Sequence, residues 1–224
     1  MKKFILFVAS LAMVVGMQAQ PTHKFLQKQL NRYSNCKSVA ITKRNGDAML
    51  YGSCGWKATQ CPIEFTRLLF ELSEVKTSIH DIHLSELGRW IILYGDNKTY
   101  SDLLYENLKI KISECQADQE EITTVTFNDG GDWIVITEKA ISASSDDLMG
   151  WLTDGCDKYG QLWTACLTDD AAIAIYEFGF KYWGNVPEDL KDALRACKSD
   201  VYTVKMAGKS WFFKCTDGYN CYSL

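Results

Sequence analysis

A cysteine beside a histidine is the first chemistry that this sequence suggests, because an imidazole can accept the proton of a thiol and so create a nucleophile. The chain of 224 residues holds nine cysteines but only three histidines. Cys166 and His83 occupy equivalent positions in two of the repeated units described below. In an open sheet they would lie four strands apart, which is roughly 19 Å, whereas a nucleophile and its base need about 3 Å. We therefore expect no catalytic pair here unless the repeat closes on itself.

The remaining polar clusters do not predict a metal or cofactor site. His80 and His83 are three residues apart, and on a strand such residues point to opposite faces and cannot share one ion. The acidic residues at 129, 132, 169 and 170 fall at hairpin turns, where Asp is favoured because it bonds to the local backbone. The chain contains no P-loop, no G-x-G-x-x-G and no G-x-S-x-G motif. We assign no catalytic residue, no metal ligand and no cofactor from the sequence.

The amino-terminal stretch has the pattern of a secretory signal peptide. Lysines precede an apolar run from Phe4 to Met17, and a small residue follows at Ala19. The run is too short for a comfortable membrane span, so we expect a signal peptide at 1–19 and a soluble mature chain. The formal net charge is −4, and no basic face for nucleic acid or anionic lipid is evident. We therefore expect an exported protein, periplasmic, secreted or attached to the cell surface, with no nucleic-acid partner and no membrane span in the mature chain.

All the cysteines lie beyond the expected signal peptide, and export permits disulfides. Cys54 and Cys61 flank one loop, and Cys215 and Cys221 flank the last one. We expect local disulfides 54–61 and 215–221, the second because it would tie down a chain end that otherwise frays. The cysteines at 115, 156 and 197 fall near the ends of equivalent helices. Packed helices run too far apart for a disulfide between equivalent positions, so we expect these three to be reduced.

An internal repeat must position all of these residues. The segments 84–94 and 127–137 share one spacing of an apolar residue, a glycine, a tryptophan and two aliphatic residues. Related patterns place the starts of five units near Cys36, Ile79, Ile122, Leu162 and Val201. In each unit a strand of alternating polar and apolar residues precedes a turn and a second, more apolar strand. Such units must bury their apolar faces against one another.

Helical periodicity precedes each predicted hairpin. Apolar residues recur at intervals of three and four, and predict helices near 23–34, 62–76, 101–114, 145–157 and 187–198. The sequence thus predicts an α+β fold of five tandem α-β-β units in one domain, at about 20–52, 53–95, 96–138, 139–178 and 179–224. We expect a curved, largely antiparallel sheet with the helices on one face. A ring or an array of pseudo-dimers would satisfy the same pattern.

Two sets of residues are candidates for ligand binding. The first strands carry a repeated polar face, whose candidate residues are His83, Thr126, Asn128, Thr164 and Thr168. Repeat proteins often use such a ladder for recognition, although threonine is also common on solvated sheet faces because it suits strands. Trp90 and Trp133 each open a second strand, and their rings would either stack on a ligand or pack in the core under a helix.

A repeated scaffold without a catalytic constellation favours an exported, soluble binding or interaction protein whose partner is another protein or a glycan. One alternative is an exported hydrolase with its site in the loops after the second strands. Those loops vary most between units, and variable loops on a constant scaffold are where function usually lies. The other alternative is a peptidase inhibitor that uses the same loops as a wedge.

Overall fold

The computed structural model describes residues 23–218 and 220–224, so the expected signal peptide at 1–19 lies outside the described residues. In the described part of the chain, each helix is followed by three strands. The helices are α1 (Lys24–Arg32), α2 (Ile63–Glu74), α3 (Glu106–Ala117), α4 (Asp146–Tyr159) and α5 (Glu188–Ala196). The strands are β1 (Cys36–Ile41), β2 (Asp47–Tyr51), β3 (Gly55–Thr59), β4 (Ile79–Leu84), β5 (Trp90–Tyr94), β6 (Lys98–Asp102), β7 (Ile122–Phe127), β8 (Trp133–Thr137), β9 (Ile141–Ala143), β10 (Leu162–Leu167), β11 (Ala171–Tyr176), β12 (Gly179–Gly184), β13 (Val201–Ala207), β14 (Ser210–Cys215) and β15 (Asn220–Ser223).

The strands form three-stranded antiparallel sheets in the orders β1-β2-β3, β4-β5-β6, β7-β8-β9, β10-β11-β12 and β13-β14-β15. The predicted α+β fold, with five tandem units of a helix and a hairpin, is therefore confirmed. Each unit also has a third strand, which pairs with the second. We number the units 1 to 5 in chain order, and each unit is one helix with the sheet that follows it.

The sheets are built alike, including a bulge in every first strand. Leu84 lies opposite Trp90 and Phe127 lies opposite Trp133, as equivalent pairs beside the turn. In each first strand the register shifts after the first residue, so that one residue bulges, at positions 37, 80, 123, 163 and 202. A bulge bends its strand and re-aims a side chain. The bulged residues are exposed or half-buried, whereas the rest of each first strand is buried.

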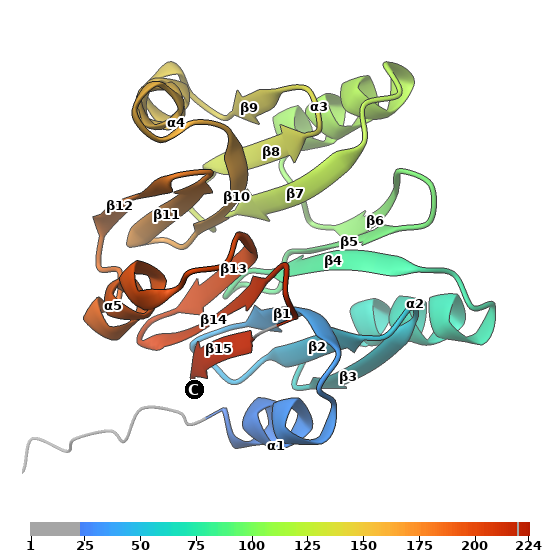
Figure 1. The fold of residues 1–224 in the computed structure, drawn as a ribbon. Coiled ribbons are helices and arrows are strands. Elements are labelled where there is room, and N and C mark those ends of the chain that lie inside the picture. The colour runs from blue at the N-terminus through green and yellow to red at the C-terminus, as the bar shows by residue number, and fades with distance from the viewer. Residues whose placement is uncertain (1–22, 219) are drawn as a thin grey trace, which may run out of the picture.

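The sheets stand around a common axis and close into a ring. The first strand of each unit contacts the first strand of the next, from β1 through β4, β7 and β10 to β13, and β13 in turn contacts β1. Figure 1 shows the red unit 5 beside the blue unit 1, with the helices on the outside. Of the arrangements that fit the sequence pattern, the chain therefore adopts the ring.

The apolar core is divided among the joints between neighbouring units. In the joint of units 1 and 2, Phe65 of α2 packs with Leu50 of one sheet and Ile92 of the other. α3, α4 and α5 fill the next three joints in the same way. α1 fills the joint of units 5 and 1, where Leu26 packs with Phe212 of β14. The first helix and the last sheet thereby complete the ring.

Side-chain size explains why the ring closes. Most axis-facing residues of the first strands are small, among them Ser38, Ala40 and Thr126, so the inner strands approach one another closely. The helices hold the outer strands apart, because a helix with its side chains is about 10 Å wide. Each unit is thus a wedge, and a constant rotation per repeat bends the array until its ends meet.

Some elements differ from the sequence-based expectation. The segments 55–59, 98–102, 141–143 and 179–184, which we expected to be loops, form third strands, and 220–223 forms the third strand of the last unit. These are short edge strands with many polar residues, so they lack the buried pattern by which a strand is recognised. α3 begins at Glu106 and not near Ser101, because Ser101 pairs with Ile91 in the sheet. With each unit defined as one helix and the sheet that follows it, units 1 to 4 end after their third strands.

Candidate functional site

The polar face of the first strands, which we considered as either an ordinary solvated sheet face or a recognition surface, is buried at the centre of the ring. It forms three layers: Ser38, Asp81, Thr124, Thr164 and Thr203; then Ala40, His83, Thr126, Cys166 and Lys205; then Thr42, Ser85, Asn128, Thr168 and Ala207. All of these residues except Thr168 are buried. The centre of the ring is therefore a packed column of mostly polar side chains.

These polar side chains form hydrogen bonds from each unit to the next. Nε2 of His83 lies 2.7 Å from the carbonyl oxygen of Phe127. Oγ1 of Thr126 accepts a hydrogen bond from the backbone N–H of Leu167 at 2.9 Å. A polar group can be buried without a large penalty only when it is hydrogen-bonded. The polar ladder thus joins the units, which is why serine and threonine are buried here.

One buried ion pair crosses the axis. Nζ of Lys205 in unit 5 donates to Oδ2 of Asp81 in unit 2 at 2.9 Å, and to the carbonyl oxygen of Ile82 at 3.0 Å. Asp81 also accepts a hydrogen bond from the hydroxyl of Ser38 in unit 1. The side chains of Lys205 and Asp81 are only 5 % and 11 % exposed. A buried charge needs a partner of opposite sign, so this pair ties unit 5 to unit 2 across the ring.

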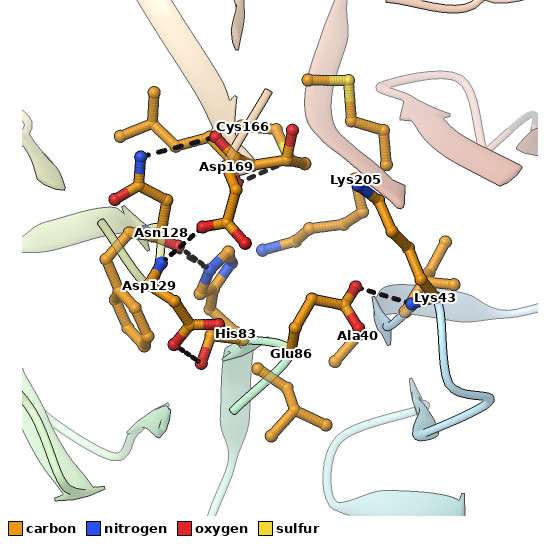
Figure 2. Close-up of a pocket in the computed structure, with 16 residues that line it drawn as sticks. Ala40, Lys43, His83, Glu86, Asn128, Asp129, Cys166, Asp169 and Lys205 are labelled. Carbon is orange, nitrogen blue, oxygen red and sulfur yellow. Dashed lines mark hydrogen bonds between the residues drawn. The ribbon is translucent and has the colours of Figure 1, made fainter. Parts of the chain in front are cut away.

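A narrow pocket of about 30 Å³ lies at the turn end of the axis. Its buried part holds His83, Cys166 and Lys205, and its rim carries side chains of the hairpin turns (Figure 2). The apolar side chains that line it are Ala40, Ile41, Leu84, Phe127, Leu167 and Met206. One water-sized group needs at least ~10–15 Å³. The pocket therefore admits the end of a side chain or a very small molecule.

Carboxylates from three successive turns lie on the rim of this pocket. Glu86 accepts a hydrogen bond from the backbone N–H of Lys43 at 2.6 Å, and Asp169 accepts one from the backbone N–H of Asp129 at 2.8 Å. Asp129 accepts from the turn of unit 2, so each carboxylate bonds to the turn of the preceding unit. Asp129 also lies 3.4 Å from Nε of Arg89. Among the described residues, Glu86 and Asp169 have no ion-pair partner.

This series of hydrogen bonds between successive turns is interrupted at unit 5, where the turn contains Gly208 instead of an acidic residue. The side chain of Lys43 passes 3.6 Å from the position of a Cβ on Gly208, and its Nζ pairs with Asp170 of unit 4 at 3.2 Å. The side chain of Lys43 thus reaches from unit 1 past unit 5 to unit 4, where the carboxylate of Asp170 neutralises its charge. The pKa of Glu86 is raised, mainly by burial and also by the nearby rim carboxylates, although Lys43 lowers it. A positively charged ligand group would relieve this repulsion.

Ring closure brings Cys166 and His83 to one pocket, so the separation calculated for an open sheet does not apply. Their protonation states nevertheless disfavour a nucleophilic pair. Burial raises the pKa of the Cys166 thiol to about 11. Burial, and then the charge of Lys205, lowers the pKa of His83 to about 3. At neutral pH the thiol is protonated and the imidazole is neutral, and it is the thiolate that reacts.

The ring divides the polar residues that we selected for binding. His83, Asn128 and Thr168 line the axial pocket. Thr126 and Thr164 are each 1 % exposed and lie between units, so they cannot join the other three in one open face.

Trp90 and Trp133 are buried in the joints beside α2 and α3, and are 2 % and 5 % exposed. The ring of Trp90 packs edge-on against Phe65, with centroids 5.6 Å apart. Their indole rings therefore offer no face to a ligand, and the stacking role that we considered is corrected to core packing.

Other pocket residues were not selected as binding candidates from the sequence, namely Lys43, Glu86 and Lys205. Asp129 and Asp169 were assigned only to their turns. Glu86, Asp129 and Asp169 occupy equivalent turn positions in successive units. A repeat known to close into a ring would therefore have placed all three on the rim of one pocket.

The expected disulfide between Cys54 and Cys61 does not fit the structure. These residues lie beyond opposite ends of β3, in which Gly55 pairs with Tyr51 and Thr59 pairs with Asp47. A five-residue strand spans about 17 Å, whereas the Cα atoms of a disulfide lie within about 7 Å.

Comparisons with known proteins do not place this chain in a family. No family model and no curated protein matches its sequence. Among solved structures it matches virginiamycin B lyase from Staphylococcus aureus, with a TM-score of 0.29 and 9 % identity, over 87 % of this chain and 71 % of that one. A similarity of this level carries no functional inference. In the described residues, no helix is both long and apolar enough to span a membrane.

Proposed function

We propose that this protein is an exported binding protein, and that the rim of its axial pocket binds the positively charged end of a lysine or arginine side chain of a partner polypeptide. The supporting observation is the pair of rim carboxylates, Glu86 and Asp169, that border the pocket without a cationic partner of their own. The two basic residues that line the pocket cannot neutralise them, because Lys43 pairs with Asp170 and Lys205 pairs with Asp81.

The shape of the pocket supports a side chain as the ligand. With a volume of about 30 Å³ it is too small for a whole peptide or sugar. The carboxylates suit the charged end of a basic side chain, since hydrogen bonds between ions are about twice as strong as neutral ones. The rest of the partner would lie over the turns.

Binding of short model compounds tests this proposal by titration calorimetry. We expect acetyl-lysine methylamide and acetyl-arginine methylamide to bind, and acetyl-norleucine methylamide, which lacks the charge, not to bind. Glu86→Gln and Asp169→Asn should each weaken binding about tenfold or more, because each removes one charged acceptor. Glu74→Gln, on the exposed surface of α2, is the matched control and should bind normally.

The raised pKa of Glu86 adds a pH test. Binding should weaken as the pH falls, starting at a higher pH than the usual range of a glutamate, because the protonated carboxyl no longer attracts a cation. Equal binding of the norleucine compound, or full binding by both rim variants, would refute the site. Binding of an uncharged oligosaccharide instead would transfer the function to a glycan partner.

The sequence-based alternatives make different predictions. A hydrolase with its site after the second strands would have to use the third strands, which form the outer edges of the sheets. A hydrolase that used Cys166 and His83 would need a reactive thiol. We expect Cys166→Ser and His83→Ala to leave any hydrolytic activity of the folded protein largely intact, and Cys166 to resist iodoacetamide at pH 7.5. Rapid alkylation of Cys166 would favour the enzyme, and inhibition of an exported peptidase would favour the inhibitor.

Export rests on the sequence pattern of residues 1–19. The mass of the protein recovered from outside the cytoplasm should correspond to a chain cleaved near Ala19. Recovery of only the uncleaved chain in the cytoplasm would contradict export.

A further inference from the structure

Two cysteine thiols touch in the last unit of the ring. Sγ of Cys197 lies 3.3 Å from Sγ of Cys215. Cys215 is fully buried, and Cys197 is half-buried. Both belong to the apolar core between units 4 and 5. The side chains therefore need to move by little more than 1 Å to reach the bond length of a disulfide.

The backbone around these thiols is held by elements that meet at the same place. Cys197 is the residue that ends α5, in an extended conformation. Cys215 is the last residue of β14 and pairs with Val201, the first residue of β13. The backbone N–H of Thr216 donates to the carbonyl oxygen of Asp200 at 2.9 Å, directly beside this pair. The fold thus brings the two thiols together and keeps them there.

We propose that Cys197 and Cys215 form a disulfide when the reduced protein meets a disulfide oxidant, such as oxidised glutathione or the disulfide of a thiol oxidase. The thiolate of Cys197 attacks one sulfur of the oxidant and releases the first oxidant thiolate, which takes up a proton. The thiolate of Cys215 then attacks Sγ of Cys197 and releases the second oxidant thiol. Two protein thiols are oxidised to one disulfide, and the oxidant disulfide is reduced to two thiols.

The order of these steps follows from access. Cys197 is the more exposed thiol, so it meets the oxidant first. Cys215 is enclosed in the core, and burial, together with the neighbouring Cys197 thiol, raises its pKa to about 12. Cys215 is therefore a poor first nucleophile, but its contact with Cys197 makes it the resolving thiol of a mixed disulfide.

The same geometry disfavours the bridge between Cys215 and Cys221 that the sequence suggested. Cys221 lies opposite Phe213, so it is a diagonal neighbour of Cys215 and not its direct partner. Diagonal neighbours on paired strands are about 7–8 Å apart, beyond the usual range of about 4.4–6.8 Å for the Cα atoms of a disulfide. Cys197 was expected to be reduced because its helix equivalents are too far apart. Its partner lies on a strand instead.

The disulfide would fasten α5 to the final sheet. It would close the segment 198–214, which contains the whole of β13, and so restrict the unfolded chain. It would also hold one side of the sheet that must contact unit 1 for the ring to close. For a loop of this length in a chain of this size, we expect oxidation to raise the thermal midpoint by about 5–10 °C.

Peptide mapping of the unaltered protein tests the proposal directly. The purified, reduced protein is equilibrated with a glutathione buffer, its remaining thiols are blocked with iodoacetamide, and the digest is analysed without reduction. We expect a peptide that links Cys197 to Cys215, together with the rise in the thermal midpoint. A link between Cys215 and Cys221, or alkylation of both Cys197 and Cys215 after oxidation, would overturn the proposal.

Serine variants give an independent measurement. Cys197→Ser and Cys215→Ser should each abolish the thermal shift on oxidation, whereas Cys221→Ser and Cys54→Ser should retain it. Should Cys215→Ser unfold because its site is buried, Cys197→Ser at the more exposed position and the mapping of the unaltered protein still decide the question. Loss of the shift in Cys221→Ser with its retention in Cys197→Ser would assign the bond to Cys221 and refute the pairing.

Discussion

The ion pair between Asp81 and Lys205 offers the sharpest test of the closed ring, because its partners belong to units 2 and 5. In an open, curved sheet these units would stand three units apart and the two charges would not meet. We consider the variants Asp81→Asn and Lys205→Met and the protein that carries both. Each single change leaves one buried charge without its partner, whereas the double change leaves none.

The expected energies follow from the 2.9 Å separation of Nζ and Oδ2. With an effective dielectric constant of about 20, two unit charges at this distance attract by ~6 kcal/mol. Much of this attraction is offset by the cost of removing both ions from water. Each single variant should therefore lose about 3–5 kcal/mol of unfolding free energy. The double variant should lose less than the sum of the two, with a coupling energy of about 2–3 kcal/mol.

Urea unfolding of the four proteins at pH 7, followed by circular dichroism, measures this coupling. A second cycle on Glu106 and Lys109 serves as the control, because this pair lies on the exposed surface of α3 and should show no measurable coupling. Additive losses for Asp81 and Lys205 would mean that the two charges do not interact. The contact across the axis, and with it the closed ring, would then be refuted.

Three further changes test other parts of the structure. The pKa of His83 is lowered in the folded protein, so between pH 6.5 and about 3 the unfolded chain binds a proton at this residue and the folded protein does not. The unfolding free energy should be fully retained above the ordinary histidine pKa of 6.5. It should fall by up to about 5 kcal/mol as the pH drops toward 3. Urea titrations across this range should show a flatter profile for His83→Gln but not for His80→Gln at the exposed position on the same strand. In α4, Gly150→Ala should stabilise the protein by up to about 1 kcal/mol, since nothing lies near the new methyl group. Gly155→Ala should instead destabilise it by about 1–3 kcal/mol, because its Cβ would overlap the Tyr176 hydroxyl group. Reversed signs in thermal melts would contradict the packing described for this helix. Leu26→Ala, at the fully buried contact of α1 with the last unit, should lower the unfolding free energy measured in urea by about 2–5 kcal/mol. Ile63→Ala, at an exposed position of α2, should change it by less than about 0.5 kcal/mol. Equal effects of the two variants would mean that α1 does not hold the closing joint.

The repeated unit could be predicted from local sequence patterns. The equivalence of Trp90 and Trp133, each after a glycine-containing turn, correctly indicated the hairpins, and helical spacing located all five helices. The third strands could not be found in this way, because an edge strand such as β6 is mostly polar and exposed. Its pairing depends on the neighbouring strand and not on its own composition.

Burial of the polar face is the point at which sequence reasoning failed. We treated Thr126 and His83 as surface residues because polar side chains are usually exposed. Contacts between residues about 40 positions apart satisfy their hydrogen bonds and make burial possible. Lys205 is the extreme case, since its charged partner among the described residues, Asp81, is 124 residues away along the chain. The candidate pocket could not be predicted for the same reason, because it exists only where all five units meet.

The joint at α1 has a consequence for the order in which the chain is connected. The hydroxyl of Tyr222 in β15 donates to Oδ1 of Asn31 in α1 at 2.9 Å, so the first helix and the last strand of the described residues touch. Every joint consists of a helix between two sheets, so the ring itself does not distinguish one unit as the first. A circular permutant that linked residue 224 to residue 23 and opened the chain before α2 would keep all five joints. In the natural order, three joints can form before the last sheet has emerged from the ribosome, whereas both joints of unit 5 must wait for it.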